Sequence, residues 1–263
     1  MGSPRHSTLT RTQKWPYANR VCPCLCNAIS FHLDAVREAS MGEPVHPLDD
    51  RADPLLSALR RGVLPLSQKD GLMLLYGHPA ALVLGLYAAA DRALAGEAVV
   101  YLDGANAFDP FVISRVARTH RAQPRTLLTS IHVARAFTCH QMERLVSDCL
   151  ATALSRYQAR VAILSGPLET FYDEAVSSDE ATRLLKRMIT SLQKLSRQGY
   201  RALCLCPSVS PQHQNRYGLL MRLQAAATRL IRVEDAEGLL SLYEETAGSS
   251  KQWQIPRAVL EYV

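Results

Sequence analysis

Apolar positions along this chain repeat in two ways, which together predict alternating strands and helices from about residue 50 onward. Short uninterrupted apolar runs are typical of buried strands and occupy residues 71–77, 98–103, 161–166 and 200–206. Helices are expected at residues 80–94, 110–123, 142–154 and 177–198. Apolar residues at every third or fourth position, which are typical of a core-facing helix, are clearest at residues 142–154. Strands that alternate with helices of this length predict an α/β fold whose mostly parallel sheet carries helices on both faces.

Local signals refine this pattern. Ser177 and Glu180 form a capping box at the start of one predicted helix, and Gly199 follows it at the position where helices commonly stop. Residues 127–137 contain another extended run. Residues 228–234 and 239–244 predict a hairpin about the turn at residues 235–238, so we expect an antiparallel edge at the C-terminal end of the sheet.

Composition supports a globular protein. The chain has 263 residues, of which 48% are hydrophobic and 21% charged, and its formal net charge is +6. These values exclude a disordered or collagen-like chain, and the length suits one principal domain with its own core. Only five of the 30 basic residues are lysine; arginine suits phosphate and carboxylate binding, although its predominance is first of all a compositional bias.

The N-terminal part differs from the rest. Residues 1–40 are basic and rich in turn-forming residues, and we expect a poorly ordered extension before a single α/β domain at residues 41–263. Cys22, Cys24 and Cys26 have C-x-C-x-C spacing without the second cysteine pair that a structural zinc site requires, so no metal is expected there.

Seven cysteines without a disulfide pattern or an apolar leader favour a reducing compartment, and we expect the cytoplasm. Residues 71–90 carry no formal charge and are numerous enough to span a bilayer. However, His78, Pro79 and three glycines interrupt the segment, and no Lys/Arg cluster flanks it. We therefore expect no contact with a membrane.

Three stretches resemble one known family, the RecA/RadA-type recombinases, over roughly residues 60–246. Residues 101–110 (YLDGANAFDP) are similar to that family's Y-[IL]-D-T-E-G-x-F-x-P motif. Residues 134–137 (ARAF) with His140-Gln141 are similar to A-R-A-[FY]-N-x-D-H-Q, and residues 228–232 (TRLIR) resemble the start of its edge hairpin. The resemblance implies a RecA-like, P-loop-NTPase-type α/β fold with an antiparallel C-terminal hairpin.

The same resemblance locates the residues on which that family's chemistry depends. A P-loop reads G-x₄-G-K-[ST], because the lysine pairs with phosphate and the hydroxyl holds magnesium. At the matching turn, which begins at Gly77, Val83 occupies the lysine position and Leu84 the hydroxyl position. Ala105 and Ser165 occupy the two acidic positions. We therefore expect no bound nucleotide, metal or other cofactor and no catalytic residue, as in a pseudo-ATPase.

A second reading makes the chain an enzyme or ligand-binding protein of another doubly wound family. Such sheets bind ligands in the crevice at the carboxyl ends of their strands, which four polar residues of this chain could line: His78, Asp103, Asn106 and Ser165. A crevice filled by Leu82, Val83 and Phe108 would count against this reading. Cys139 and His140 are sequence neighbours on a helix start, where side chains point about 100° apart, so we do not expect a catalytic pair.

The distribution of charge indicates where DNA could bind. In the family that the chain resembles, single-stranded DNA passes two loops. The first loop corresponds here to residues 167–178, which are acidic through Glu169, Asp173 and Glu174 and would repel phosphate. The second corresponds to residues 207–218, where Arg216 is the main basic residue. Positive charge lies elsewhere, for residues 183–201 hold six basic residues and no acid. A further arginine row is predicted to share one face of the helix at residues 110–123 and its extension: Arg115, Arg118, Arg121 and Arg125.

The leading hypothesis is a non-catalytic RecA-like adaptor or assembly subunit in DNA recombination or repair. Its expected partner is a protein, such as an active RecA-like subunit or a DNA-repair protein. The arginine row and Arg216 are its candidate residues for contact with a partner or with nucleic acid, and direct DNA contact stays open.

Overall fold

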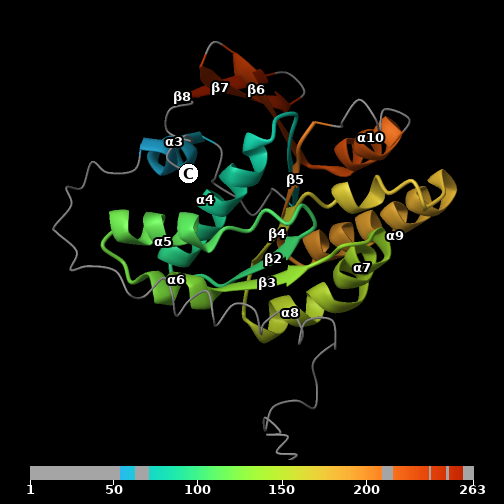
Figure 1. The fold of residues 1–263 in the computed structure, drawn as a ribbon, viewed down its shortest axis with the longest axis horizontal. Coiled ribbons are helices and arrows are strands. Elements are labelled where there is room, and N and C mark those ends of the chain that lie inside the picture. Colours follow the sequence, from blue (N-terminus) through green and yellow to red (C-terminus); the bar gives the residue numbers. More distant parts are fainter. Residues whose placement is uncertain (1–53, 63–70, 209–215, 237, 247–248, 257–263) are drawn as a thin grey trace, which may run out of the picture.

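In the computed structural model the described residues are 54–62, 71–208, 216–236, 238–246 and 249–256, and they form one sheet of eight strands in the order β3-β2-β4-β5-β1-β6-β7-β8 (Figure 1). The strands are β1 (Leu72–Tyr76), β2 (Val99–Asp103), β3 (Ile131–Arg135), β4 (Val161–Ser165), β5 (Arg201–Cys206), β6 (Arg229–Ala236), β7 (Leu239–Thr246) and β8 (Ser249–Pro256). Pairing is parallel from β3 to β6 and antiparallel from β6 to β8. The predicted fold class is confirmed.

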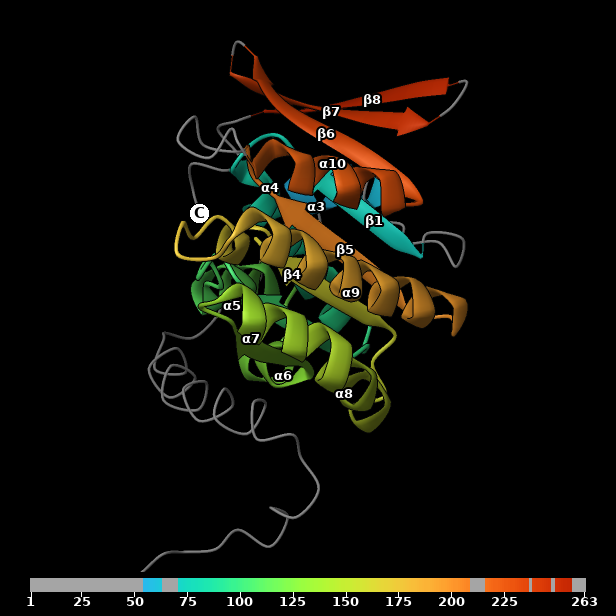
Figure 2. The same cartoon turned by 90° about the vertical axis from the view of Figure 1, so that its right-hand side faces the viewer.

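Helices cover both faces of this sheet (Figure 2). One layer comprises α3 (Pro54–Gly62), α4 (Ala80–Leu94), α5 (Pro110–Thr119) and α6 (Pro124–Ser130). The other comprises α7 (Cys139–Arg144), the π-helical segment η2 (Leu145–Cys149), α8 (Leu150–Arg156), the 3₁₀ turn η3 (Glu169–Phe171), α9 (Ser178–Arg197) and α10 (Tyr217–Ala226). The parallel strands are therefore buried on both sides, which explains their uninterrupted apolar runs.

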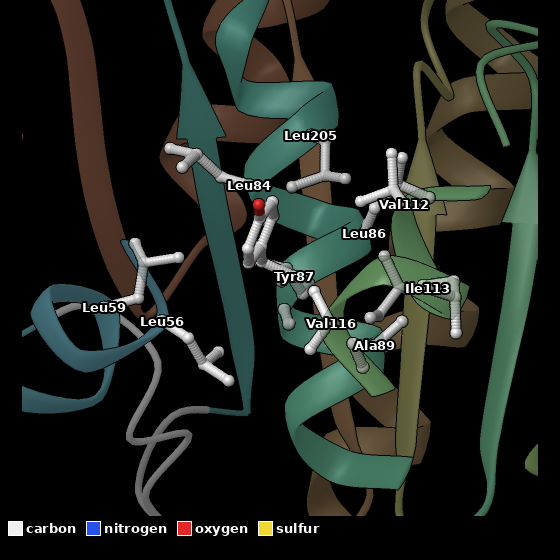
Figure 3. Packing of buried hydrophobic residues seen from close by; sticks show 14 of the residues in the cluster. Leu56, Leu59, Leu84, Leu86, Tyr87, Ala89, Val112, Ile113, Val116 and Leu205 are labelled. Carbon is white, nitrogen blue, oxygen red and sulfur yellow. The ribbon is translucent and has the colours of Figure 1, made fainter. Parts of the chain in front are cut away.

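The alternating residues of each strand divide the core in two. Tyr101 and Ile163 pack with the α4 layer, whereas Leu102 and Leu164 pack with the α9 layer. Figure 3 shows apolar side chains of α4 between those of α3 and those of α5. Helix α4 lies so close to β5 that a Cβ added to Gly85 would fall 2.0 Å from Leu205 Cδ1.

Some predicted boundaries are wrong. Residues 124–130 form a short helix that starts at Pro124, so only residues 131–135 of the predicted 127–137 run are a strand. Helix α5 ends at Thr119, and Arg121 then adopts a φ of +55°. Helices α3 and α10 and strand β8 have no counterpart in the predicted elements.

The N-terminal extension and a membrane-spanning segment are the two remaining features that the sequence raised. The basic extension at residues 1–40, with its three cysteines, lies outside the described residues. Among the residues that are described, no helix combines the length and the apolar character needed to cross a membrane.

Candidate functional site at the strand ends

The parallel strands β1, β2, β4 and β5 end at one edge of the sheet, which is where α/β proteins usually bind ligands. Asp103 pairs in register with Ser165, and Tyr76 pairs with Cys206. Two turns leave this edge for the same helix layer: residues 77–79 lead from β1 to α4, and residues 104–109 lead from β2 to α5.

In the first turn the chain satisfies its own backbone donors. The Gly77 N–H donates to the Cys206 carbonyl oxygen at 3.1 Å, and the Ala80 N–H donates to His78 Nδ1 at 3.1 Å. The Ala81 and Leu82 N–H groups donate to the carbonyl oxygens of His78 and Pro79, both at 3.0 Å. Proline has no N–H. The donors with which a phosphate-binding loop cradles its ligand are thus engaged within the turn or with β5.

The side chains at the lysine and hydroxyl positions of this turn supply neither charge nor hydroxyl. Val83 is partly buried and packs with Leu82 against the core, and Leu84 is completely buried. Gly77 has a φ of +109°, and a Cβ there would lie 2.7 Å from the Val233 carbonyl oxygen. A magnesium–nucleotide phosphate group requires a cation, a metal-binding hydroxyl and available N–H donors. The residues at this turn do not fit such a group.

The second turn is organised by a buried carboxylate. Asp103 is 1% exposed and accepts hydrogen bonds from the backbone N–H groups of Ala107 at 3.0 Å and Phe108 at 3.1 Å. Its Oδ2 also lies 3.4 Å from Arg135 Nε. The Phe108 ring packs edge-to-face on Tyr101, with centroids 5.1 Å apart. Asp109 then caps α5 by accepting from the Phe111 N–H.

The four polar residues of the alternative crevice do not converge. Asp103 is committed to its own turn, Asn106 is exposed, and His78 Nε2 lies 3.9 Å from Asp235 Oδ2 of β6. Ser165 is completely buried, and its Oγ has no hydrogen-bond partner among the described residues. Phe108, which is 7% exposed, packs on Tyr101 beside this strand end. These contacts count against a small ligand here.

The turns after β2 and β4 touch each other. Gly104 donates to the Ser165 carbonyl oxygen at 2.8 Å, and a Cβ on Gly104 would lie 2.7 Å from the Gly166 carbonyl oxygen. Burial raises the pKa of the neighbouring Tyr101 hydroxyl, so the phenol stays neutral. No group of three or more His, Cys, Asp or Glu side chains that could hold a metal occurs in the described ranges.

The arginine row is divided among three elements. Arg115 and Arg118 lie on α5, Arg121 lies in the following turn, and Arg125 lies in the first turn of α6. The prediction that one continuous helix carries all four is wrong, because α5 ends earlier. Arg118, Arg121 and Arg125 are nevertheless exposed. Arg115 is partly buried, and one of its terminal nitrogens has no hydrogen-bond partner among the described residues.

Arg216 points into the protein. It is 7% exposed and donates to the carbonyl oxygens of Phe171, at 2.5 Å, and Val176. These bonds tie the acidic loop after β4 to the start of α10. A guanidinium so engaged is not presented to a phosphate or to a partner. The acidic residues of that loop are exposed, as expected from the sequence: Glu169, Asp173 and Glu174.

The side chains of Cys139, which is buried, and His140, which is exposed, contact each other although the two residues are sequence neighbours. Cys139 Sγ lies 3.5 Å from His140 Nδ1, and His140 Nε2 lies 3.1 Å from Glu180 Oε1. The spacing of residues in the sequence could not predict this Cys139–His140–Glu180 contact, because Glu180 comes from the start of another helix. Burial raises the pKa of the Cys139 thiol, and the residue is completely buried, so its contacts favour a protonated, inert thiol.

Comparison with known proteins agrees with this architecture. A family model described as Rad51 matches residues 82–220. The crystal structure of the RadB recombinase is similar over 71% of this chain and 87% of that chain, with 14% sequence identity and a TM-score of 0.53. No curated protein matches the chain.

Proposed function

Since the chain belongs to the Rad51 family of RecA-like recombinases, we propose that it serves DNA recombination or repair as a non-catalytic assembly subunit. One observation carries the proposal: in the turn before α4 the chain occupies its own backbone donors and offers Val83 and Leu84 to the position of a phosphate. Removal of both the cation and the N–H cradle leaves no group to bind the terminal phosphates.

The acidic positions support the same conclusion. Magnesium needs carboxylate or hydroxyl oxygens beside the phosphates, and an attacking water needs a base or a positioning residue. Ala105 supplies neither, and the Ser165 hydroxyl is completely buried. Asp103, at the end of β2, is held by two backbone N–H groups. We therefore propose that hydrolysis is absent together with nucleotide binding.

A subunit without turnover acts through its surfaces, and the α5–α6 face suits a protein partner. Phe111 is 65% exposed and lies on the same side of α5 as Arg115 and Arg118, at positions i, i+4 and i+7. Exposed aromatic rings beside arginines are enriched in protein–protein interfaces. Arg121 and Arg125 extend this face beyond α5. The proposed partner is an active RecA-like subunit or another DNA-repair protein.

Thermal unfolding with ATP tests the first part of the proposal. We expect no rise in Tm of the purified full chain at about 5 mM ATP with excess magnesium. A Kd of about 1 mM would add roughly 1 kcal/mol and raise Tm by about 2–4 °C, so the experiment detects even weak binding. A saturable rise would refute the proposal.

Quantitative binding to a purified partner tests the second part. The partner is first identified by crosslinking in the host cell and then titrated against the wild type and the Phe111→Ser/Arg118→Glu variant. We expect a loss of at least about 30-fold, because hot-spot aromatic and arginine residues each contribute about 2 kcal/mol or more. Unchanged affinity would remove the α5–α6 face from the proposal.

A further inference from the structure

Helix α9 carries a row of cations along its outer side. Arg183, Lys186, Arg187, Lys194 and Arg197 fall within an arc of about 100° around the helix axis, and the row is about 21 Å long at 1.5 Å per residue. All five are exposed. The opposite side of α9 is buried in the core through Leu185, Met188 and Leu192. The row therefore faces solvent along most of the helix.

Acidic residues neutralise only one end of this row. Arg183 lies 3.5 Å from Glu180, and Arg187 Nε lies 3.3 Å from Glu143 of α7. Across the part of the chain that the structure describes, no carboxylate forms an ion pair with Lys186, Lys194 or Arg197.

The elements beside α9 leave the charge of this row unchanged. Helix α7 lies next to α9 (Figure 2). Together α7 and segment η2 add one exposed cation, Arg144, and one exposed acid, Asp148. Between residues 181 and 200 the sequence contains no Asp or Glu. A surface of one sign over this length attracts a polyanion.

The row lacks the apolar anchors of a protein interface. Among the described residues, the large hydrophobic side chains that are exposed are those of Phe111, Phe137, Tyr217 and Met221. None belongs to α9 itself, although Tyr217 and Met221 lie on the neighbouring helix α10. Protein–protein interfaces depend on buried aromatic or aliphatic anchors, whereas phosphate backbones are bound by cations and other hydrogen-bond donors without such anchors. The α5–α6 face, with Phe111, and the α9 face, without such a residue, thus differ in the kind of ligand they suit.

We propose that the outer face of α9 binds the phosphate backbone of duplex DNA, independently of sequence. The inference rests on the proposed role in recombination or repair, and it identifies the surface that would contact DNA. A row of charges about 21 Å long can follow the axis of a duplex, which presents one phosphate charge per about 1.7 Å of axis. The exposed acids of residues 167–178 repel phosphate, so the duplex lies along α9 rather than across the strand ends.

Fluorescence anisotropy with a labelled 20-base-pair duplex of mixed sequence tests this surface. The test variant is Lys186→Gln/Lys194→Gln/Arg197→Gln, whose three cations form no ion pair in the described structure. We expect at least about 30-fold weaker binding in low salt, and a slope of log K against log salt that is shallower by about 2.7, or 0.9 for each of three contacts. An unchanged slope would overturn the proposal.

A matched control removes equal charge from elements other than α9. Arg156→Gln/Arg222→Gln/Lys251→Gln replaces exposed cations of α8, α10 and β8 and lowers the net charge by the same amount. We expect its DNA affinity to stay within about threefold of the wild type. Equal losses in both variants would mean a net-charge effect and would overturn the α9 site. Tighter binding of duplex RNA by the same residues, or no binding of DNA by the wild type, would also overturn it. Circular dichroism and Tm verify that both variants are folded.

The two proposals fail separately. A saturable ATP-dependent rise in Tm refutes the non-catalytic role and leaves the anisotropy result standing. Loss of partner binding without loss of DNA binding in the α5–α6 variant supports two separate surfaces.

Discussion

Two turns at one edge of the sheet show how differently this chain treats neighbouring parts of a RecA-like architecture. Both leave the carboxyl end of a parallel strand and enter a helix of the same layer, α4 from residue 80 and α5 from residue 110. The second turn retains a family-like motif, and a buried carboxylate organises it. The first turn carries Val83 and Leu84 where the resemblance implies a lysine and a hydroxyl residue, and it closes on its own backbone.

The difference separates residues that hold the backbone from residues that hold a ligand. In the second turn Tyr101, Asp103 and Phe108 keep the motif because each makes an internal contact that the fold needs. Ala105 lies within the same motif, and its methyl side chain forms no hydrogen bond that could hold the turn. A side chain that contacts only a ligand makes no such internal contact, so its substitution leaves these contacts of the scaffold intact.

The largest expected effect comes from Asp103→Ala. This change leaves the buried N–H groups of Ala107 and Phe108 without an acceptor and removes the partner of Arg135, so we expect the free energy of unfolding to fall by about 3 kcal/mol. Urea denaturation measures it. Asp109→Ala in the same turn is the control: it removes one exposed helix cap and should cost about 1 kcal/mol. Equal costs would mean that Asp103 does not organise the turn.

The fold of the core could be predicted from the sequence, whereas the direction of loop side chains could not. Uninterrupted apolar runs identify β1, β2, β4 and β5 because both faces of these strands are buried. Strand β8 is more difficult: its residues are largely polar, and it exists through pairing with β7. The short helix α6 escapes a periodicity argument because it has only seven residues.

Arg216 shows which part of the candidate site could not be predicted from the sequence. Its carbonyl acceptors, Phe171 and Val176, lie 45 and 40 residues away in sequence. No local pattern distinguishes such an arginine from an exposed one. The prediction that Val83 and Leu84 occupy the lysine and hydroxyl positions of a P-loop rests instead on a motif, because the backbone turn that carries a P-loop has a fixed spacing.

In the first turn, Gly77→Ala should destabilise the protein by about 2 kcal/mol. A Cβ there would lie 2.7 Å from the Val233 carbonyl oxygen, and the φ of +109° is unfavourable for alanine. Gly96→Ala is the matched control, since its φ is +78° and no atom lies within 4 Å of the added Cβ. It should cost only about 1 kcal/mol. If chemical denaturation gives the same value for both, the close approach of the turn to β6 contributes nothing.

His78→Ala should have a smaller effect, about 1 kcal/mol, because it removes the acceptor of one N–H at the start of α4. His78→Asn retains a side-chain oxygen that can accept from Ala80 and should recover most of this stability. Thermal unfolding of both variants measures the difference. A loss in His78→Asn as large as that in His78→Ala would show that the Nδ1 contact does not stabilise the helix start.

The smallest expected effect is the response of Val83→Lys to ATP. The substitution restores the one cation that a phosphate site needs, at a partly exposed position, yet the N–H groups of Ala80, Ala81 and Leu82 remain bonded within the turn and no hydroxyl is supplied. We therefore expect Tm to stay within about 1 °C on addition of about 5 mM magnesium–ATP, whereas a Kd of 1 mM would raise it by about 2–4 °C. The double variant His78→Ala/Val83→Lys also releases the Ala80 N–H. If ATP raises the Tm of the double variant alone, the hydrogen bonds within the turn block the site. If ATP raises the Tm of Val83→Lys by the full amount, only the charge is missing and the turn can still bind phosphate.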